Sequence, residues 1–205
     1  MDLSPVTLKG RLVNLEPLEA AHAGELWEAG RDPSLWRWTL VSVRTREDME
    51  RYVRKALEKA GSGTALPFVH RDLRTGRIAG STRFGSVEHH HRKVEIGWTW
   101  LGKAWQRTGI NTEAKLLMLR HAFCGWDCVR VEFKTDVLNH TSRRAIERIG
   151  GVQEGVLRSH LITEEGRVRD TVYYSILAQE WPDVEGRLEG LLSGAGEMPT
   201  PAGSS

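Results

Sequence analysis

Cysteine is scarce in this chain of 205 residues, which contains only Cys124 and Cys128. Two thiols cannot build the disulfide framework of a small secreted domain, and no second pair completes a four-ligand zinc site. We interpret both as reduced thiols near the end of a helix. Since no export signal accompanies them, the sequence predicts a cytoplasmic location.

Long apolar runs and a charge bias are also missing. No stretch approaches the ~18 apolar residues that suggest a membrane span, and residues 1–10 lack the basic and apolar segments of a signal peptide. The formal net charge is +2, without the clustered basic face of a nucleic-acid-binding protein. We therefore expect neither a membrane nor a nucleic acid as a partner.

Two local patterns resemble binding motifs but lack essential parts. Gly61 and Gly63 are not followed by the third glycine of a dinucleotide-binding fingerprint. The histidines at 89–91 have no carboxylate or cysteine at ligand spacing, so a solvated loop is favoured over a metal site. The sequence predicts no metal.

The composition is that of an ordinary globular domain, with 40% hydrophobic and 27% charged residues. A chain of this length suits one domain with a sizeable core. We expect one domain over residues 8–182, followed at 183–205 by the remnant of a C-terminal helix and a disordered tail.

Hydrophobic periodicity divides the chain into strands and helices. Period-two patterns predict strands at 11–16, 66–71, 78–86, 93–101, 129–135, 152–163 and 168–177. Helical patterns occupy 18–29, 45–61, 112–123 and 139–149, with a last helix at 180–192. Thr45 with Asp48 resembles a capping box, and Asn139 suits an N-cap.

The order of these elements defines the fold class. The strand–helix–strand–helix part from 93 to 149 implies locally parallel strands joined by a crossover, and the remaining strands should be antiparallel. We predict an α/β (α+β) fold with a mixed, mostly antiparallel sheet of about seven strands flanked by about four helices, in the order β-α-α-β-β-β-α-β-α-β-β.

The stretch from Glu95 to Ala114 combines a strand, a turn with Gly109 and the start of a helix. The first N–H groups of a helix lack internal partners, and the helix dipole adds partial positive charge there. Such a turn binds anions without a basic side chain.

Three segments, in this order, carry a resemblance to a known family. Glu95–Trp98 begins a strand, Gln106–Asn111 fits the loop Q/R-x-x-G-x-G/A except for its last residue, and Asn139–Ser142 continues to Gly150. The chain resembles the GNAT superfamily of acetyl-CoA-dependent N-acetyltransferases from about residue 8 to 181. The ribosomal-protein-alanine N-acetyltransferase branch is the most similar.

This resemblance implies a splayed sheet that holds acetyl-CoA. The pyrophosphate would bind the backbone from Arg107 to Asn111, where Gly109 allows close approach and keeps a Cβ away from the phosphates. The pantetheine arm would lie along the strand that ends at Leu101. The implied cofactor-binding residues are Trp98, Trp100, Leu101, Gln106, Arg107, Thr108, Gly109, Ile110, Asn111, Thr112, Asn139 and Ser142.

The resemblance also implies two catalytic residues. Glu95 is the candidate base, acting through water, and the alternative is a structural carboxylate. Many members of the superfamily have a tyrosine acid where this chain has Ile146. Ser142 is then the candidate donor to the thiolate, and the alternative is an ordinary residue of the capped helix. Neither cysteine falls in a cofactor motif, which argues against a covalent acyl-enzyme.

Residues from the early helices and the last hairpin would form the acceptor side. The candidates are Trp36, Trp38, His160 and Tyr174, each with plain packing as the alternative. We expect direct transfer to a primary amine, in the first instance a protein N-terminal α-amine. The alternatives are a small amine, such as a polyamine or aminoglycoside, and a CoA-binding sensor without turnover. A homodimer is frequent in the resembled family.

Overall fold

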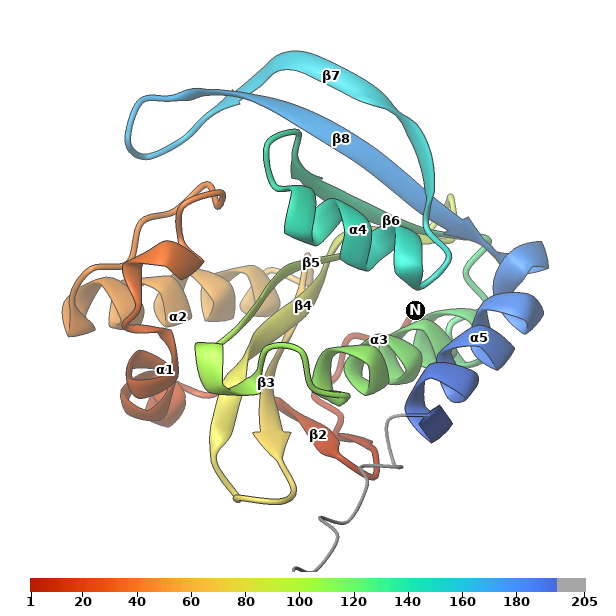
Figure 1. Cartoon of the computed structure of the whole chain (residues 1–205), viewed down its shortest axis with the longest axis horizontal. Coiled ribbons are helices and arrows are strands. Elements are labelled where there is room, and N and C mark those ends of the chain that lie inside the picture. The colour runs from red at the N-terminus through yellow and green to blue at the C-terminus, as the bar shows by residue number, and fades with distance from the viewer. Residues whose placement is uncertain (195–205) are drawn as a thin grey trace, which may run out of the picture.

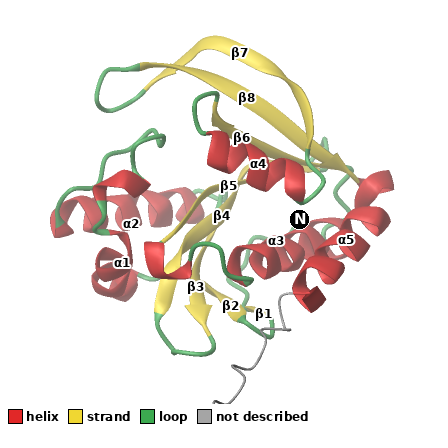
Figure 2. Cartoon of the chain, in the orientation of Figure 1, coloured by secondary structure: helices red, strands yellow, loops and turns green. Residues whose placement is uncertain are grey.

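An open sheet of eight strands runs through the molecule in the order β1-β2-β3-β4-β5-β6-β8-β7 (Figures 1 and 2). The computed structural model describes residues 1–194. The strands are β1 Leu8–Lys9, β2 Val13–Pro17, β3 Leu66–Asp72, β4 Ile78–Glu88, β5 Lys93–Leu101, β6 Arg130–Asp136, β7 Val152–Ile162 and β8 Val168–Leu177. All seven predicted strands are confirmed, and β1 is a short addition at one edge.

Helices cover both faces of this sheet. They are α1 Ala23–Gly30, α2 Arg46–Gly61, α3 Ile110–Arg120, α4 His140–Arg148 and α5 Trp181–Gly194. Helices α1 and α2 pack together on one side of the sheet, and α3 and α5 pack together on the other (Figure 2). None of the helices within residues 1–194 is long and apolar enough to cross a bilayer.

The predicted helix caps are confirmed. The Thr45 side chain accepts from the Asp48 N–H while the Asp48 carboxylate accepts from the Thr45 N–H, which completes a capping box at α2. The Asn139 side chain likewise accepts from the Ser142 N–H at the start of α4. These caps fix where the two helices begin.

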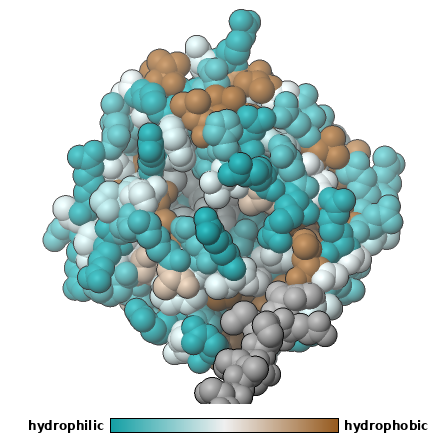
Figure 3. Space-filling view, viewed as in Figure 1, coloured by the Kyte–Doolittle hydropathy of each residue, from teal (hydrophilic) through white to brown (hydrophobic). Residues whose placement is uncertain are grey.

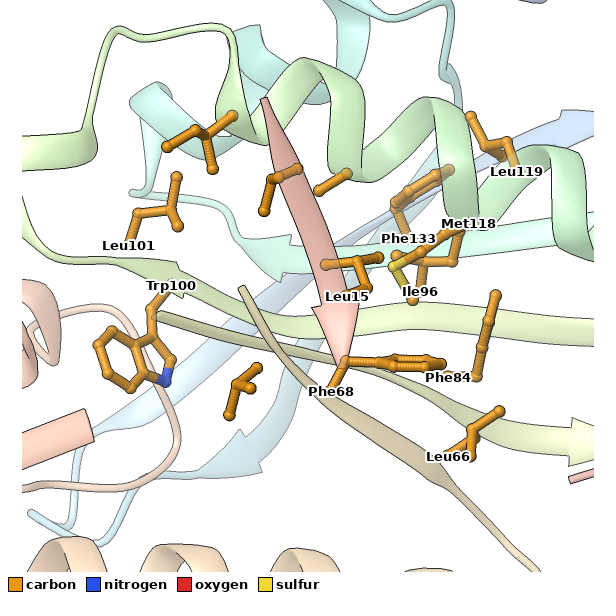
Figure 4. Close-up of a cluster of buried hydrophobic side chains, with 14 of the residues drawn as sticks. Leu15, Leu66, Phe68, Phe84, Ile96, Trp100, Leu101, Met118, Leu119 and Phe133 are labelled. Carbon is orange, nitrogen blue, oxygen red and sulfur yellow. The ribbon is translucent and has the colours of Figure 1, made fainter. Parts of the chain in front are cut away.

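The main core fills the space between the sheet and α3 (Figure 4). It joins Phe68 and Phe84, whose ring centroids lie 6.0 Å apart, to Met118 and Leu119 of α3. These four side chains are fully buried. The apolar residues of α3 on more than one side, visible in the sequence, thus reflect a helix covered by other elements.

The C-terminal helix belongs to this packed unit. Val184, Leu188 and Leu192 of α5 are buried, and Trp181 stacks on Phe123 with centroids 5.5 Å apart. The domain predicted to end near residue 182 therefore continues through α5, because the apolar side of this helix packs against α3. The predicted disordered tail lies outside the described residues from 195 onward.

The only parallel strand pair in residues 1–194 joins β5 to β6, as the crossover predicted. It lasts for three residues on each strand, Lys93–Glu95 beside Arg130–Glu132. Beyond Glu95, β5 continues along β4 while β6 continues along β8. The sheet therefore splays at the place that the family resemblance predicted.

Candidate functional site

A β-bulge interrupts β5 next to the splay. Here β5 contributes two residues, Trp98 and Thr99, where the facing β4 contributes only Thr82. The Trp98 backbone has a φ of +51°, a left-handed conformation that is uncommon outside glycine. Bulges of this kind redirect side chains near functional sites, and this one turns the exposed Trp98 side chain over Gly85 of β4.

The predicted anion-binding loop lies between β5 and α3. The Gln106 side chain donates to the Leu101 carbonyl at 3.0 Å, and the Thr108 hydroxyl donates to the Trp105 carbonyl at 2.7 Å. Arg107 has a φ of +62°. The N–H groups of Asn111 and Thr112 have no acceptor among residues 1–194. These side-chain hydrogen bonds hold the loop in place and leave donors free at the helix start.

Gly109 lies immediately before the first residue of α3. Its φ of −68° is an ordinary helical value. A Cβ at this position would lie 2.6 Å from Cδ1 of Leu12. The missing Cβ therefore leaves room for the Leu12 side chain, which is 41% exposed, and the close approach of the phosphates to Gly109 stays a prediction.

Two further side chains meet at the start of α3. Oδ1 of Asn111 is buried without a hydrogen-bond partner among residues 1–194. Arg148, at the end of α4, donates to the Thr112 hydroxyl at 2.9 Å. Free N–H donors, the helix dipole and a nearby guanidinium suit a pyrophosphate, so the residues present fit coenzyme A.

Glu95 is 7% exposed and lies at the last parallel pair before the splay. Its Oε2 accepts from Ser86 Oγ at 2.9 Å and from Lys134 Nζ at 2.8 Å. Its Oε1 has no partner among residues 1–194 and would lie 2.9 Å from a Cβ placed on Gly97. One oxygen is therefore anchored, while the other lies beside the backbone that leads into the bulge.

Lys134 links Glu95 to the last hairpin. Burial opposes its charge, but the neighbouring Glu95 carboxylate raises the pKa of Lys134 above its ordinary value. Its Nζ lies 4.9 Å above the Tyr173 ring, and that ring meets His160 edge-on at 5.8 Å. Nδ1 of His160 is buried without a partner among residues 1–194. His160 thus belongs to the group of side chains that contains Glu95.

Ser142 lies in the first turn of α4, at the end of β6 where that strand has left β5. Its hydroxyl forms no hydrogen bond within residues 1–194, whereas its N–H is taken by Asn139 at 3.1 Å. Ile146 is buried and would touch a Cβ placed on Gly151. Ile146, at the position where the resemblance implies a tyrosine acid in many members of the superfamily, therefore contributes to packing in this chain.

The two cysteines stay apart from these groups. Both are free thiols. Burial raises the pKa of the Cys128 thiol to about 11, which keeps it protonated and unreactive at neutral pH. Within residues 1–194, no cluster of histidine, cysteine or carboxylate side chains could hold a metal ion.

A pocket of about 460 Å³ lies on the α2 side of the bulge. Its lining comes from α2, β4, the loop before α2 and the tip of the β7–β8 hairpin, and includes Tyr52, Arg83, Trp98 and Glu164. The hairpin tip is tied to the loop, since Glu164 N–H donates to the Leu40 carbonyl at 3.0 Å. Helix α2, the loop before it and the hairpin tip thus enclose this pocket, whereas α1 contributes no lining residue.

The four residues predicted for the acceptor side lie in different environments. Trp36 is 6% exposed and packs against Trp100, so it is a core residue. Tyr174 is fully buried, and its hydroxyl is occupied by Glu147 at 2.8 Å, which makes it a packing residue too. The Trp38 ring contacts two guanidiniums, that of Arg37 at 4.7 Å and that of Arg167 from the hairpin tip at 5.4 Å. Trp38 and His160 remain available to the acceptor side.

Three relevant residues were missed in the sequence. Lys134 and Arg148 act through partners far along the chain, and their positions depend on how β6 and α4 lie in the fold. Arg83 lies within a predicted strand. Its charge is buried only because α2 packs over that strand in the folded protein. No local pattern could have identified these contacts.

Comparison with known proteins agrees with this geometry. Residues 12–152 match the acetyltransferase (GNAT) domain family. The chain is 36% identical over 109 residues to the "Putative ribosomal N-acetyltransferase YdaF" of Bacillus subtilis, covering 53% of this chain and 58% of that one. The chain thus spans little more than half the length of that curated relative.

Solved structures show the same fold over most of the chain. A GCN5-related N-acetyltransferase from Brucella melitensis has a TM-score of 0.85 at 31% identity, covering 92% of this chain and 86% of that one. RimJ from Mycobacterium smegmatis, in complex with CoA-disulfide, has a TM-score of 0.79 at 25% identity, covering 92% and 96%. The family match and the splayed sheet together show that this chain belongs to the GNAT family of acetyltransferases.

Proposed function

We propose that this protein transfers an acetyl group from acetyl-CoA directly to a primary amine, in the first instance the α-amine of a protein N-terminus. The observation that carries the proposal is a partly free carboxylate oxygen, Glu95 Oε1, beside Gly97 on β5 and next to the bulge whose Trp98 lines the α2 pocket. The names of YdaF and RimJ support a protein acceptor.

The residues at the start of α3 and α4 bind the co-substrate. Bound acetyl-CoA supplies the activated acetyl group. The free N–H groups of Asn111 and Thr112, with Arg148 nearby, hold the pyrophosphate. The main chain from Trp98 to Leu101, including Trp100, lies along the open edge of β5, where β6 no longer occupies its hydrogen-bonding positions.

Glu95 accepts the proton that the amine must lose. An α-amine titrates near ~8, so a base is needed at neutral pH, though less than for a lysine side chain. Ser86 and Lys134 hold Oε2, which leaves Oε1 to take the proton through a water molecule. The free hydroxyl of Ser142 is the donor that we assign to the leaving thiolate.

Release of free thiol with a panel of N-terminal peptides and small amines tests the reaction. Amine-dependent release supports transfer, whereas binding of acetyl-CoA without release across the panel favours a non-catalytic CoA sensor. Preferential use of polyamines or aminoglycosides would favour a small-amine enzyme. Against that alternative, four cationic side chains and three carboxylates line the pocket, so it is not acidic.

Substitution of Glu95 tests the base. Glu95→Gln should lower turnover about 100-fold near pH 7, with a loss that shrinks as pH rises and more amine is already deprotonated. Glu132→Gln is the matched control. Glu132 is a second carboxylate near Lys134, at 3.6 Å, but it lies on β6 and has no proposed role as a base. An unchanged pH profile in Glu95→Gln would remove Glu95 as the base.

Substitution of Ser142 separates two roles. Ser142→Ala should reduce turnover more than affinity for acetyl-CoA, whereas the exposed neighbour Thr141→Ala should affect neither. Equal losses in turnover and affinity for Ser142→Ala would instead assign Ser142 to binding or to the start of α4.

The setting of the reaction follows from the same features. Both thiols are free, as a reducing compartment leaves them, which supports a cytoplasmic location. Apolar side chains gather over the β7–β8 hairpin at the top of Figure 3, and Val156, Leu157 and Ile162 of the edge strand β7 are exposed. These support a homodimer through the hairpin, which light scattering of the purified protein would test.

A further inference from the structure

Arg83 carries a charge that the chain itself does not neutralise. It lies on β4 and is only 6% exposed. Among residues 1–194 its guanidinium has no ion pair, and its Nε is buried without a hydrogen-bond partner. A buried cation is normally paired, because removal from water is unfavourable without a compensating partner. Arg83 also lines the α2 pocket, so a ligand there could supply the missing anion.

Two aromatic rings hold this guanidinium in place. Its Cζ lies 4.8 Å from the centre of the Trp98 ring and 5.4 Å from that of Tyr52. Cation–π contacts stabilise the charge through the ring faces but leave the N–H donors unsatisfied. Because the group is planar and already oriented, it is suited to a bidentate hydrogen bond with a carboxylate.

The carboxylates of the same pocket are already engaged. The pairs are Asp48 with Arg51, Glu164 with Lys55 and Glu88 with Lys93. None forms an ion pair with Arg83, and Lys59 adds a second pocket cation without a salt bridge among residues 1–194. The unpaired charge of the pocket is therefore positive.

Arg83 also lies close to the proposed chemistry. In the β4–β5 register it is opposite Gly97, the residue beside which Glu95 Oε1 lies. An amine that approaches Glu95 and an anionic group that reaches Arg83 therefore meet at the same short segment of β5. Both groups must belong to one compact part of the acceptor.

We propose that Arg83 binds a carboxylate of the acceptor, so that the acetylated amine belongs to an acidic substrate. The carboxylate comes either from an Asp or Glu side chain in the first two residues of a peptide or from the α-carboxylate of a free amino acid. This inference rests on the proposed acetyl transfer to an amine and narrows the class of acceptor.

The test compares acceptors that differ only in one carboxylate. Peptides beginning Ser-Glu and Ser-Gln, or Asp-Ala and Asn-Ala, are assayed with acetyl-CoA, beside a free amino acid and its carboxamide. The acidic member should show a kcat/KM about 10- to 100-fold higher, as expected for a hydrogen bond between charged groups. The peptide and amino-acid arms identify the source of the carboxylate.

Arg83→Gln should reduce this acid-to-amide ratio to about one, and Arg83→Lys should retain only part of it because the planar fork is lost. The ratio cancels any general loss of activity. Arg54→Gln removes an exposed charge of α2 outside the pocket and should leave the ratio unchanged. Urea unfolding of each variant checks that it folds.

Binding measured by tryptophan fluorescence separates this inference from the proposed function. Tighter binding of acidic peptides, lost in Arg83→Gln, would support the carboxylate site even without thiol release, whereas the proposed function would then fail. In the wild-type protein, equal kcat/KM for the acid and the amide, or equal binding of the two, would overturn the inference. An acid-to-amide ratio retained in a folded Arg83→Gln variant would overturn it as well.

Discussion

Replacing Lys115 with methionine should stabilise the protein at neutral pH. Lys115 lies in α3 and is 6% exposed, and its Nζ donates to the Thr99 hydroxyl at 2.7 Å. No carboxylate forms an ion pair with it among residues 1–194. Burial lowers the pKa of Lys115 from 10.5 to about 7, so the folded state holds this proton far more weakly than the unfolded chain.

The size and sign of the effect follow from proton linkage. Between the folded pKa of about 7 and the unfolded value of 10.5, the unfolded chain binds more protons, so the free energy of unfolding rises with pH. At about 1.4 kcal/mol for each pKa unit, the buried Lys115 lowers the free energy of unfolding by about 4 kcal/mol at pH 7 and by about 2 kcal/mol at pH 9. Methionine has a similar length and removes this penalty.

Urea unfolding followed by tryptophan fluorescence at pH 7, 8 and 9 measures the difference. Lys115→Met should be more stable than the wild type at pH 7, and its advantage should shrink by about 2 kcal/mol by pH 9. The Thr99 hydroxyl retains Thr82 as a partner at 2.7 Å, so the substitution leaves no unsatisfied group. A difference that does not change with pH, or a less stable variant at pH 7, would refute the reasoning.

Three further predictions concern groups that hold the fold together. The Glu113 carboxylate accepts the N–H groups of residues 11–13; Glu113→Gln should lower the unfolding free energy by about 2 kcal/mol, and an unchanged urea midpoint would argue against this role. Burial and the charge of Lys115 lower the pKa of His70 to about 3, so stability should fall as pH drops below 6.5. His70→Leu should flatten that acid slope, and a slope equal to the wild type would contradict it. Thr45→Ala removes the capping hydroxyl of α2 and should cost about 1 kcal/mol, or a Tm decrease of about 2–4 °C, in calorimetry.

The local sequence pattern was sufficient to predict the bounds of two strands and the caps of two helices. The predicted ranges 93–101 and 168–177 match β5 and β8 residue for residue, although burial alternates along neither strand because helices or other strands cover both faces for part of their length. Caps were also readable, since Thr45 and Asn139 act on residues within one helical turn. The family motif placed the splay, which periodicity alone could not do.

The remaining features depend on contacts between distant parts of the chain. A lysine at 115 or an arginine at 83 looks like a surface residue in sequence, and only the assembled layers bury them. Tyr174 was assigned to the acceptor side because its hairpin forms that wall, but strand alternation turns it toward α4. The bulge at Trp98 arises because two residues of β5 face one residue of β4, and neither strand's sequence alone indicates this difference.

The short parallel ladder has a mechanical consequence. Three residues on each strand are the seam between a five-stranded plate, β1–β5, and a three-stranded plate, β6–β8. At the far end, the hairpin tip is fastened to the first plate's side through Leu40, Ser42 and Arg44. The two parts of the sheet are thus joined by the three-residue ladder at one end and, at the other, by one backbone hydrogen bond and two contacts of glutamate side chains. Opening the space between β5 and β6 for a ligand without breaking the parallel ladder would therefore require breaking the few contacts at the hairpin tip.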